Sequence, residues 1–157
     1  MSLSLRAATP ADVPQILRFI RQLAEYEKLL DKCVATEAQL HATLFGPRPY
    51  AETIIAEWDG QPAGFALFFH NYSTFLAQPG LYLEDLFVDP ALRGKGIGKA
   101  LLERLAQLAN ERGCGRVEWS VLDWNAPSIE FYKRMGAVPL DDWTIFRLTG
   151  DALGQYR

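Results

Sequence analysis

Two kinds of chemistry stand close together in the stretch LYLEDLFVDPALRGKGIGKALLERL, residues 81–105. The adjacent acids Glu84 and Asp85 interrupt an apolar run, and a carboxylate held among apolar groups can take a proton from an ammonium group. A few residues later, a glycine-rich turn with one arginine and two lysines opens a helix. Such a turn offers backbone N–H groups and positive charge to an anion. The stretch therefore predicts a carboxylate site beside an anion-binding loop.

The turn RGKGIGK, residues 93–99, differs from two familiar nucleotide-binding loops. A P-loop ends in GK followed by Ser or Thr, but Ala100 follows Lys99, and the glycine spacing is also wrong. A dinucleotide fingerprint needs a third glycine and an acid at the end of the next strand, and neither is present in the right place here. The accessible N–H groups, the helix dipole and the charges of Arg93 with Lys95 or Lys99 instead predict a pyrophosphate site. The structural alternative is a tight strand-to-helix turn in which the glycines only permit positive φ.

Hydrophobic periodicity and turn residues around this loop predict a mixed α/β sheet. Strands are expected at residues 3–7, 53–58, 63–72, 81–88, 116–124 and 143–148. Helices are expected at residues 10–29, 36–45 and 125–135, and directly after the glycine loop. The turn DGQP should join the second and third strands as a hairpin. In a regular fourth strand, Glu84 would share a face with Tyr82 and Leu86, and Asp85 would face the other side.

The first expected helix carries an acid where its pattern calls for a hydrophobe. Thr9 is a suitable N-cap, Pro10 suits the first helical position, and an apolar stripe runs from Ile16 to Tyr26. The next position on that face is Glu27. An exposed acid in the last turn of a helix is the plain interpretation, and a binding role is the other.

The bulk composition points to one soluble domain spanning residues 1–157. The chain is 49% hydrophobic with a formal net charge of −3, so neither nucleic acid nor anionic lipid is attracted, and a small cationic partner is favoured. Cys33 and Cys114 fit no metal-ligand spacing and no disulfide framework, which predicts reduced, buried thiols. No basic leader followed by an apolar run, and no apolar segment of membrane-spanning length, is found. These features predict a cytoplasmic protein without a metal.

The segment from Arg93 to Gly98 resembles the Q/R-x-x-G-x-G/A pyrophosphate loop of the GNAT acetyltransferase superfamily. The stretches LAEYE, YLEDLFV and NAPSIEFYKRMGA resemble the diamine acetyltransferases, the spermidine/spermine-type branch. The resemblance implies a GNAT fold, with a mostly antiparallel mixed sheet splayed between the fourth and fifth strands and about four flanking helices. It also implies acetyl-CoA as co-substrate and a homodimer. The residues that it assigns to the cofactor are Leu86, Phe87, Val88, Arg93, Gly94, Lys95, Gly96, Ile97, Gly98, Lys99, Asn125 and Ser128.

The resemblance also suggests how acetyl transfer to an amine would be catalysed. Such a reaction needs a deprotonated amine, donors to the developing oxyanion and a proton for the departing thiolate. Glu84 is the expected base, directly or through water, and backbone N–H groups of residues 86–88 are the expected donors beside a bulge in that strand. Tyr132 is the expected acid, because a phenol can protonate a thiolate held close to it. The alternative for Tyr132 is a core aromatic that packs on Ile129.

The substrate site implied by the resemblance is an acidic cavity for a small cation. Its expected residues are Tyr26, Glu27, Glu84, Asp85, Trp119 and Asp123. The chain departs from the eukaryotic diamine enzymes in a shorter connection at DGQP and in Met135, where an arginine near CoA is expected. The sequence thus predicts an N-acetyltransferase acting on a polyamine, a diamine or a lysine-like amine. Acetylation of a protein N-terminus or an antibiotic amine, and a non-catalytic acyl-CoA-binding module, are the alternatives.

Overall fold

A computed structural model describes residues 2–157, which form two compact units, one ending at Ser120 and the other beginning at Val121. The first unit contains one five-stranded sheet with the order β1-β2-β3-β4-β5. Its strands are β1 (Leu3–Ala7), β2 (Glu52–Trp58), β3 (Gln61–Ser73), β4 (Gln78–Val88) and β5 (Val117–Trp119). The first three pairings are antiparallel and the last is parallel, which confirms the expected mixed sheet.

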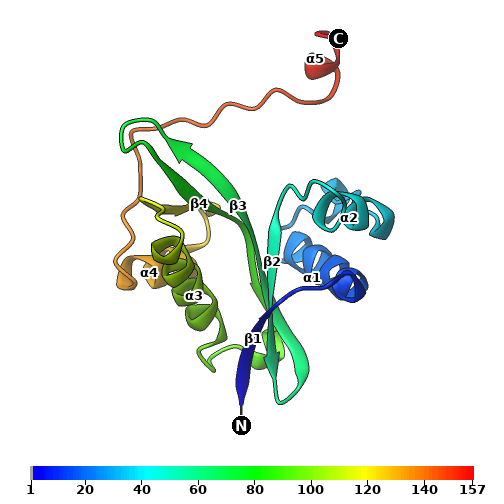
Figure 1. Ribbon diagram of the computed structural model, residues 1–157, viewed down its shortest axis with the longest axis vertical. Coiled ribbons are helices and arrows are strands. Elements are labelled where there is room, and N and C mark those ends of the chain that lie inside the picture. The colour runs from blue at the N-terminus through cyan, green and yellow to red at the C-terminus, as the bar shows by residue number, and fades with distance from the viewer. Residues whose placement is uncertain (1) are drawn as a thin grey trace. The chain divides into compact units, whose positions relative to one another are not determined.

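Three α-helices cover the two faces of this sheet. Figure 1 shows α1 (Val13–Tyr26) and α2 (Glu37–Leu44) on one face and α3 (Ile97–Glu111) on the other. On the α1 face, the ring of Phe19 stacks on Phe65 at 5.4 Å between centroids and lies 6.0 Å from Phe87. Short 3-10 turns precede α1 (Pro10–Asp12), follow it (Leu30–Lys32) and follow β4 (Pro90–Leu92). Burial of this aromatic cluster fixes the end of β4 against α1.

The first helix is interrupted at both ends of the continuous stretch expected over residues 10–29. The Thr9 N–H donates to Asp12 Oδ2 at 2.7 Å, which supports a 3-10 turn before α1 begins at Val13. At the other end, Lys28 has φ 62°, and its N–H donates to the Glu25 carbonyl at 3.0 Å. The Leu29 N–H donates to the Ala24 carbonyl at 2.8 Å. This Schellman arrangement ends the helix at Tyr26 and makes Glu27 its C-cap.

The hairpin between β2 and β3 forms as the turn sequence predicts. Asp59 and Gly60 both have positive φ, 51° and 80°, which is the twist that a two-residue hairpin turn requires. Thr36 caps α2, because the Gln39 N–H donates to Thr36 Oγ1 and the Gln39 side chain accepts from the Thr36 N–H. Local turn and cap chemistry therefore sets these boundaries.

The fifth strand is shorter than expected, and β4 leaves it after three residue pairs. The parallel register runs from Leu81 opposite Val117 to Leu83 opposite Trp119. The predicted strand over residues 116–124 was therefore wrong beyond Trp119. Since β4 continues to Val88, its edge on this side carries no strand partner past Leu83 within the described residues. The sheet is open here, as the splayed fold predicts.

The second unit contains α4 (Ala126–Arg134) and the short α5 (Gly150–Gly154). Asn125 caps α4, with its Oδ1 accepting from the Ser128 N–H at 3.4 Å. The strand predicted over residues 143–148 was wrong: this segment has no strand pairing in residues 2–157, and Trp143, Ile145 and Phe146 are exposed. Strand propensity alone does not form a strand, because an extended segment needs a neighbour for its backbone hydrogen bonds.

Two further sequence expectations concern thiols and membranes. Cys33 and Cys114 are free thiols and are only partly buried, so the prediction of buried side chains was too strong. Every helix found in residues 2–157 is too short or too polar to cross a lipid bilayer.

Candidate active site

The glycine loop after β4 has the backbone geometry of an open cradle. Gly94 and Gly96 both have φ 81°, in the left-handed region that other residues adopt only with strain. A Cβ at either position would meet no atom within 4 Å, so the loop has unfilled space above it. Gly96 is the N-cap of α3, and Ile97, 1% exposed, anchors the first turn of that helix. The loop therefore presents a helix N-terminus to an open space that an anion can enter.

Two cations of this loop, Arg93 and Lys95, each lie over an aromatic ring from a distant part of the chain. The Arg93 guanidinium carbon is 5.0 Å from the Tyr26 ring centroid and 5.9 Å from that of Phe87. Lys95 Nζ is 5.3 Å from the ring of Trp58. Lys99 is instead paired with Glu103 one turn along α3, at 3.8 Å. Sequence reasoning missed the role of Trp58, since nothing in the spacing of β2 links it to the loop.

A β-bulge places the two adjacent acids of β4. Leu67 pairs with Asp85 and Phe68 with Leu83, so Glu84 is the extra residue and has no partner on β3. The expectation of a bulge in this strand is confirmed. The bulge changes one part of the face assignment made for a regular strand: Asp85 faces away from Leu86 as expected, but Tyr82, whose ring lies 5.3 Å from Phe69, now shares the α1 face with Asp85 and Phe87. Leu86 lies on the α3 face, opposite Ala66.

Asp85 is therefore the more sheltered of the two acids, and Glu84 is exposed. Burial raises the pKa of Asp85 to about 7, with further contributions from the negative charges of Glu84 and Glu27. Burial also raises the pKa of Glu27, and Glu84 adds to this rise. Of the two acids that interrupt the apolar run, Asp85 is thus the one held among apolar groups. The negative charges of Glu84 and Glu27 thus act on Asp85, and that of Glu84 acts on Glu27, so the three carboxylates repel one another.

The end of β4 beyond the bulge keeps one side of its backbone open. Leu86, Phe87 and Val88 pair with β3 through Ala66, Phe65 and Gly64. Their opposite side lies past the last β4–β5 pair, so this segment can receive an extended ligand as an added strand. Phe87 is also buried against α1, 3% exposed, which fixes the segment in place.

The remaining candidate residues lie in β5 and in the second unit. Trp119 ends β5 and is partly buried, as is Tyr132 on α4, whose ring centroid lies 5.6 Å from that of Phe131. Asp123 is exposed, and Asn125 is buried at its cap with Ser128 as the bonded partner. The roles of these residues stay predictions.

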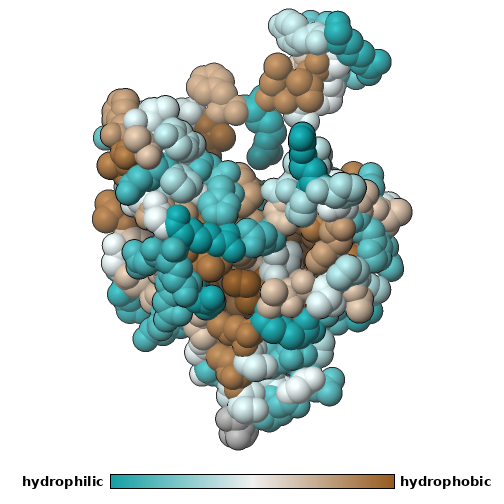
Figure 2. Space-filling view, in the orientation of Figure 1, coloured by the Kyte–Doolittle hydropathy of each residue, from teal (hydrophilic) through white to brown (hydrophobic). Residues whose placement is uncertain are grey.

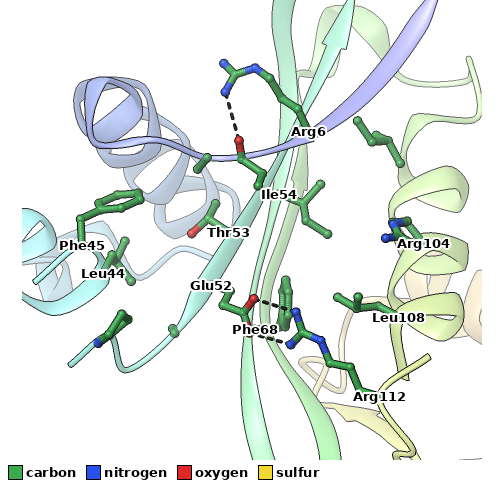
Figure 3. A pocket seen from close by; sticks show the side chains of 15 residues that line it. Arg6, Leu44, Phe45, Glu52, Thr53, Ile54, Phe68, Arg104, Leu108 and Arg112 are labelled. Carbon is green, nitrogen blue, oxygen red and sulfur yellow. Dashed lines mark hydrogen bonds and ion pairs between the residues drawn. The ribbon is translucent and has the colours of Figure 1, made fainter. Parts of the chain in front are cut away.

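A separate cavity of about 370 Å³ lies where β1 leaves the edge of β2, away from the glycine loop. Figure 3 shows Arg104 and Leu108 of α3 and its C-cap Arg112 along one wall. Arg112 donates to the Glu52 carboxylate at 2.7 and 2.9 Å. Figure 2 shows hydrophobic atoms along the middle of this face, over β1 and β2. The cavity contains none of the predicted site residues, so it is distinct from the candidate active site.

The comparisons with known proteins agree with this geometry. Residues 17–137 match the family model described as Acetyltransferase (GNAT) family. An L-ornithine N5-acetyltransferase of Arabidopsis thaliana is 38% identical over 95% of this chain and 85% of its own. A thialysine N-epsilon-acetyltransferase of Bos taurus is 38% identical, covering 95% and 94%. A human spermidine/spermine N(1)-acetyltransferase-like protein is 36% identical over 95% of this chain but only 23% of its own.

One solved structure similar to this chain is an integron cassette protein from the mobile metagenome of V. cholerae. It superposes with a TM-score of 0.83 at 26% identity, covering 99% of this chain and 97% of that one. The match covers β1 through the second unit, so the fold expected from the resemblance is confirmed. With the glycine loop at the start of α3, the bulged β4 and the family match over most of its length, this chain belongs to the GNAT acetyltransferase family.

Proposed function

We propose that this protein transfers an acetyl group from acetyl-CoA to a primary amine of a small lysine-like or polyamine substrate. The observation that carries the proposal is a group of three mutually repelling carboxylates: Glu84 and Asp85 lie on the strand that leads into the glycine loop, and Glu27 lies at the end of α1. Carboxylates attract and deprotonate an ammonium group, and the loop suits a pyrophosphate. The ornithine and thialysine acetyltransferases among the relatives support an amine with a second charged group.

The cofactor part of the proposal uses local features of the loop and of β4. Acetyl-CoA would supply the acetyl thioester. Arg93, Lys95 and the N–H groups at the start of α3 would hold its pyrophosphate, since the two left-handed glycines leave that space open. The open backbone side of residues 86–88 would bind its extended arm and donate to the reacting carbonyl. Asn125 and Ser128 would contact the same arm.

Proton transfer is assigned to two places. We assign removal of the ammonium proton to the pair Glu84 and Asp85: the first is exposed at the surface, and the second has a pKa of about 7. A base with such a pKa is partly ionised at neutral pH and still accepts a proton readily. Tyr132 is assigned the proton that the departing thiolate takes up.

The acceptor part of the proposal places the remote charge of the amine at the end of α1. Glu27 is the C-cap there, held by the Schellman turn, and Tyr26 precedes it. Trp119 and Asp123 are assigned to the walls of the same site. Two further parts of the proposal are a homodimer, which rests on the family resemblance, and a cytoplasmic location, which is the expectation from the sequence. Analytical ultracentrifugation of the purified protein tests the dimer.

A panel of amines tests the function. Ornithine, lysine, thialysine, spermidine and 1,5-diaminopentane are each incubated with acetyl-CoA, and CoA release is measured together with the mass of the product. We expect at least one of them to be acetylated. The matched pair is 1,5-diaminopentane and hexylamine, which have equal length and differ in tail charge. Glu27→Gln should raise KM for the diamine far more than for hexylamine. An equal rise for both would remove Glu27 from the substrate site, and a panel without any product would refute the substrate class.

A further inference from the structure

The cations of the glycine loop are held in place by aromatic side chains before any cofactor is bound. Arg93 lies over Tyr26 and Phe87, and its Nε donates to the Val88 carbonyl at 3.3 Å. Lys95 lies over Trp58. A cation over an aromatic face within about 6 Å of its centroid is attracted by the ring quadrupole. Each cation is thus pinned by an element far from the loop in the sequence.

These aromatic contacts are important because the backbone and side chains of the loop are otherwise little constrained. Gly94 and Gly96 lie in the left-handed region, and Arg93 and Lys95 are both exposed. Long cationic side chains lose rotamer entropy when they are fixed on a ligand. An aromatic ring that already fixes them reduces that loss, so the ring contributes to anion affinity without touching the anion.

The two aromatic contacts differ in what lies next to them. Trp58 ends β2 and precedes the hairpin turn. Tyr26 is the last residue of α1, and Glu27 follows it as the C-cap. The carboxylate of Glu27 is coupled electrostatically to Asp85 and Glu84. The Arg93–Tyr26 contact therefore joins the cofactor loop to the acid-bearing end of α1, whereas the Lys95–Trp58 contact has no such link.

We propose that Tyr26 is a positioning residue for the cofactor loop, and that through its contact with Arg93 the binding of CoA stabilises the end of α1 that carries Glu27. Trp58 positions Lys95 in the same way, but CoA binding does not stabilise α1 through this contact. The proposal rests on the part of the proposed function that places the pyrophosphate at this loop. Once the cofactor is bound, the end of α1 is more ordered and Glu27 is better placed to bind an amine.

The first test measures CoA affinity by calorimetry in the full-length protein, with CoA in place of acetyl-CoA so that no turnover occurs. Tyr26→Leu and Trp58→Leu should each weaken CoA binding about two- to fivefold, the worth of one exposed cation–π contact. Tyr26→Phe keeps the ring and should bind CoA like the wild type. In a double-mutant cycle, Tyr26→Leu should have no further effect once Arg93 is replaced by Ala. Additive losses, or a Tyr26→Leu protein that binds CoA normally, would overturn the positioning role.

The second test reads the end of α1 by hydrogen exchange. The Glu27 amide donates to the Leu23 carbonyl as part of the helix, and the amides of Lys28 and Leu29 form the Schellman bonds that close it. CoA should slow their exchange about two- to fivefold in the wild type, in Tyr26→Phe and in Trp58→Leu, but not in Tyr26→Leu. Equal protection in all four proteins, or none in the wild type, would disprove the link to α1. Because no amine is used, failure of the substrate assignment leaves both tests intact, and a wild type that does not bind CoA would refute the proposed cofactor site itself.

Discussion

The glycine loop is suited to bind an anion, whereas the acid group, which consists of Glu27, Glu84 and Asp85, is suited to bind a cation and to accept a proton. The loop, residues 93–99, is exposed and contiguous, and it offers N–H groups of one helix end and cations to an anion. The acid group takes Glu27 from the end of α1 and Glu84 with Asp85 from a bulge in β4. Its like charges repel, and burial raises the pKa of Asp85 to about 7. An anion site can therefore be encoded locally, whereas a proton-accepting site needs elements that only folding brings together.

The largest expected effect is a loss of turnover in variants of the acids that leaves cofactor binding at the glycine loop unchanged. Glu84→Gln and Asp85→Asn should each lower kcat/KM for the amine about a hundredfold or more, because each removes part of the base. The double variant should lose little more than either single one, since the pair acts as a unit. CoA affinity, measured by calorimetry, should not change in any of the three. A single variant with full kcat/KM would exclude its residue from proton transfer.

A substitution in the glycine loop should have the opposite pattern, with weaker CoA binding and an unchanged pH dependence. Arg93→Ala removes a charge-assisted contact to the pyrophosphate and should weaken CoA binding about tenfold. At saturating acetyl-CoA, the pH dependence of kcat should keep its wild-type midpoint, because the acids are unaltered. Arg104→Ala, a change farther along α3, is the control and should bind CoA normally. Unchanged CoA affinity in Arg93→Ala would place the pyrophosphate elsewhere.

A smaller effect tests the coupling within the acid group. The pKa of Asp85 is raised by burial, by Glu84 and by Glu27, so the acidic limb of kcat/KM should have its midpoint near pH 7. Glu27→Gln removes one negative charge, which lowers the pKa of Asp85 and moves this limb to lower pH. Titration of the amine itself is common to both proteins, so the ratio of the two pH profiles isolates the enzyme. A ratio that does not vary with pH would show that the charge of Glu27 does not affect the pKa of Asp85.

The smallest expected effect lies at the ion pair remote from both regions. Arg112 holds the pKa of the Glu52 carboxylate below its ordinary value. The pair therefore stabilises the fold above that ordinary pKa, and its contribution is lost as the pH falls and Glu52 is protonated. Both side chains are substantially exposed, so Arg112→Gln should lower the free energy of unfolding at pH 7 by only ~0.5 to 1 kcal/mol. Urea titrations at pH 7 and pH 3 measure this, and CoA affinity should stay at the wild-type value.

Features that depend on near neighbours in the chain were determined by the sequence alone. The capping box of Thr36 and Gln39, the hairpin turn at Asp59 and Gly60, and the glycine loop at the start of α3 form as their residue types predict. Each depends on backbone φ preferences or on hydrogen bonds within a few residues, so its energy is set by local sequence. The family resemblance also came from contiguous stretches, the glycine loop among them.

Features that depend on distant partners were decided only by the tertiary structure. The bulge at Glu84 exists because β4 and β3 pair out of step, and it moves Asp85 to the α1 face, where Glu27 can raise its pKa. Strand pattern alone mispredicted residues 120–124 and 143–148, since a strand forms only where a neighbour accepts its hydrogen bonds. The contact of Arg93 with Tyr26 is also non-local. Register, burial and the approach of like charges are properties of packed pairs of elements, and neither element specifies them by itself.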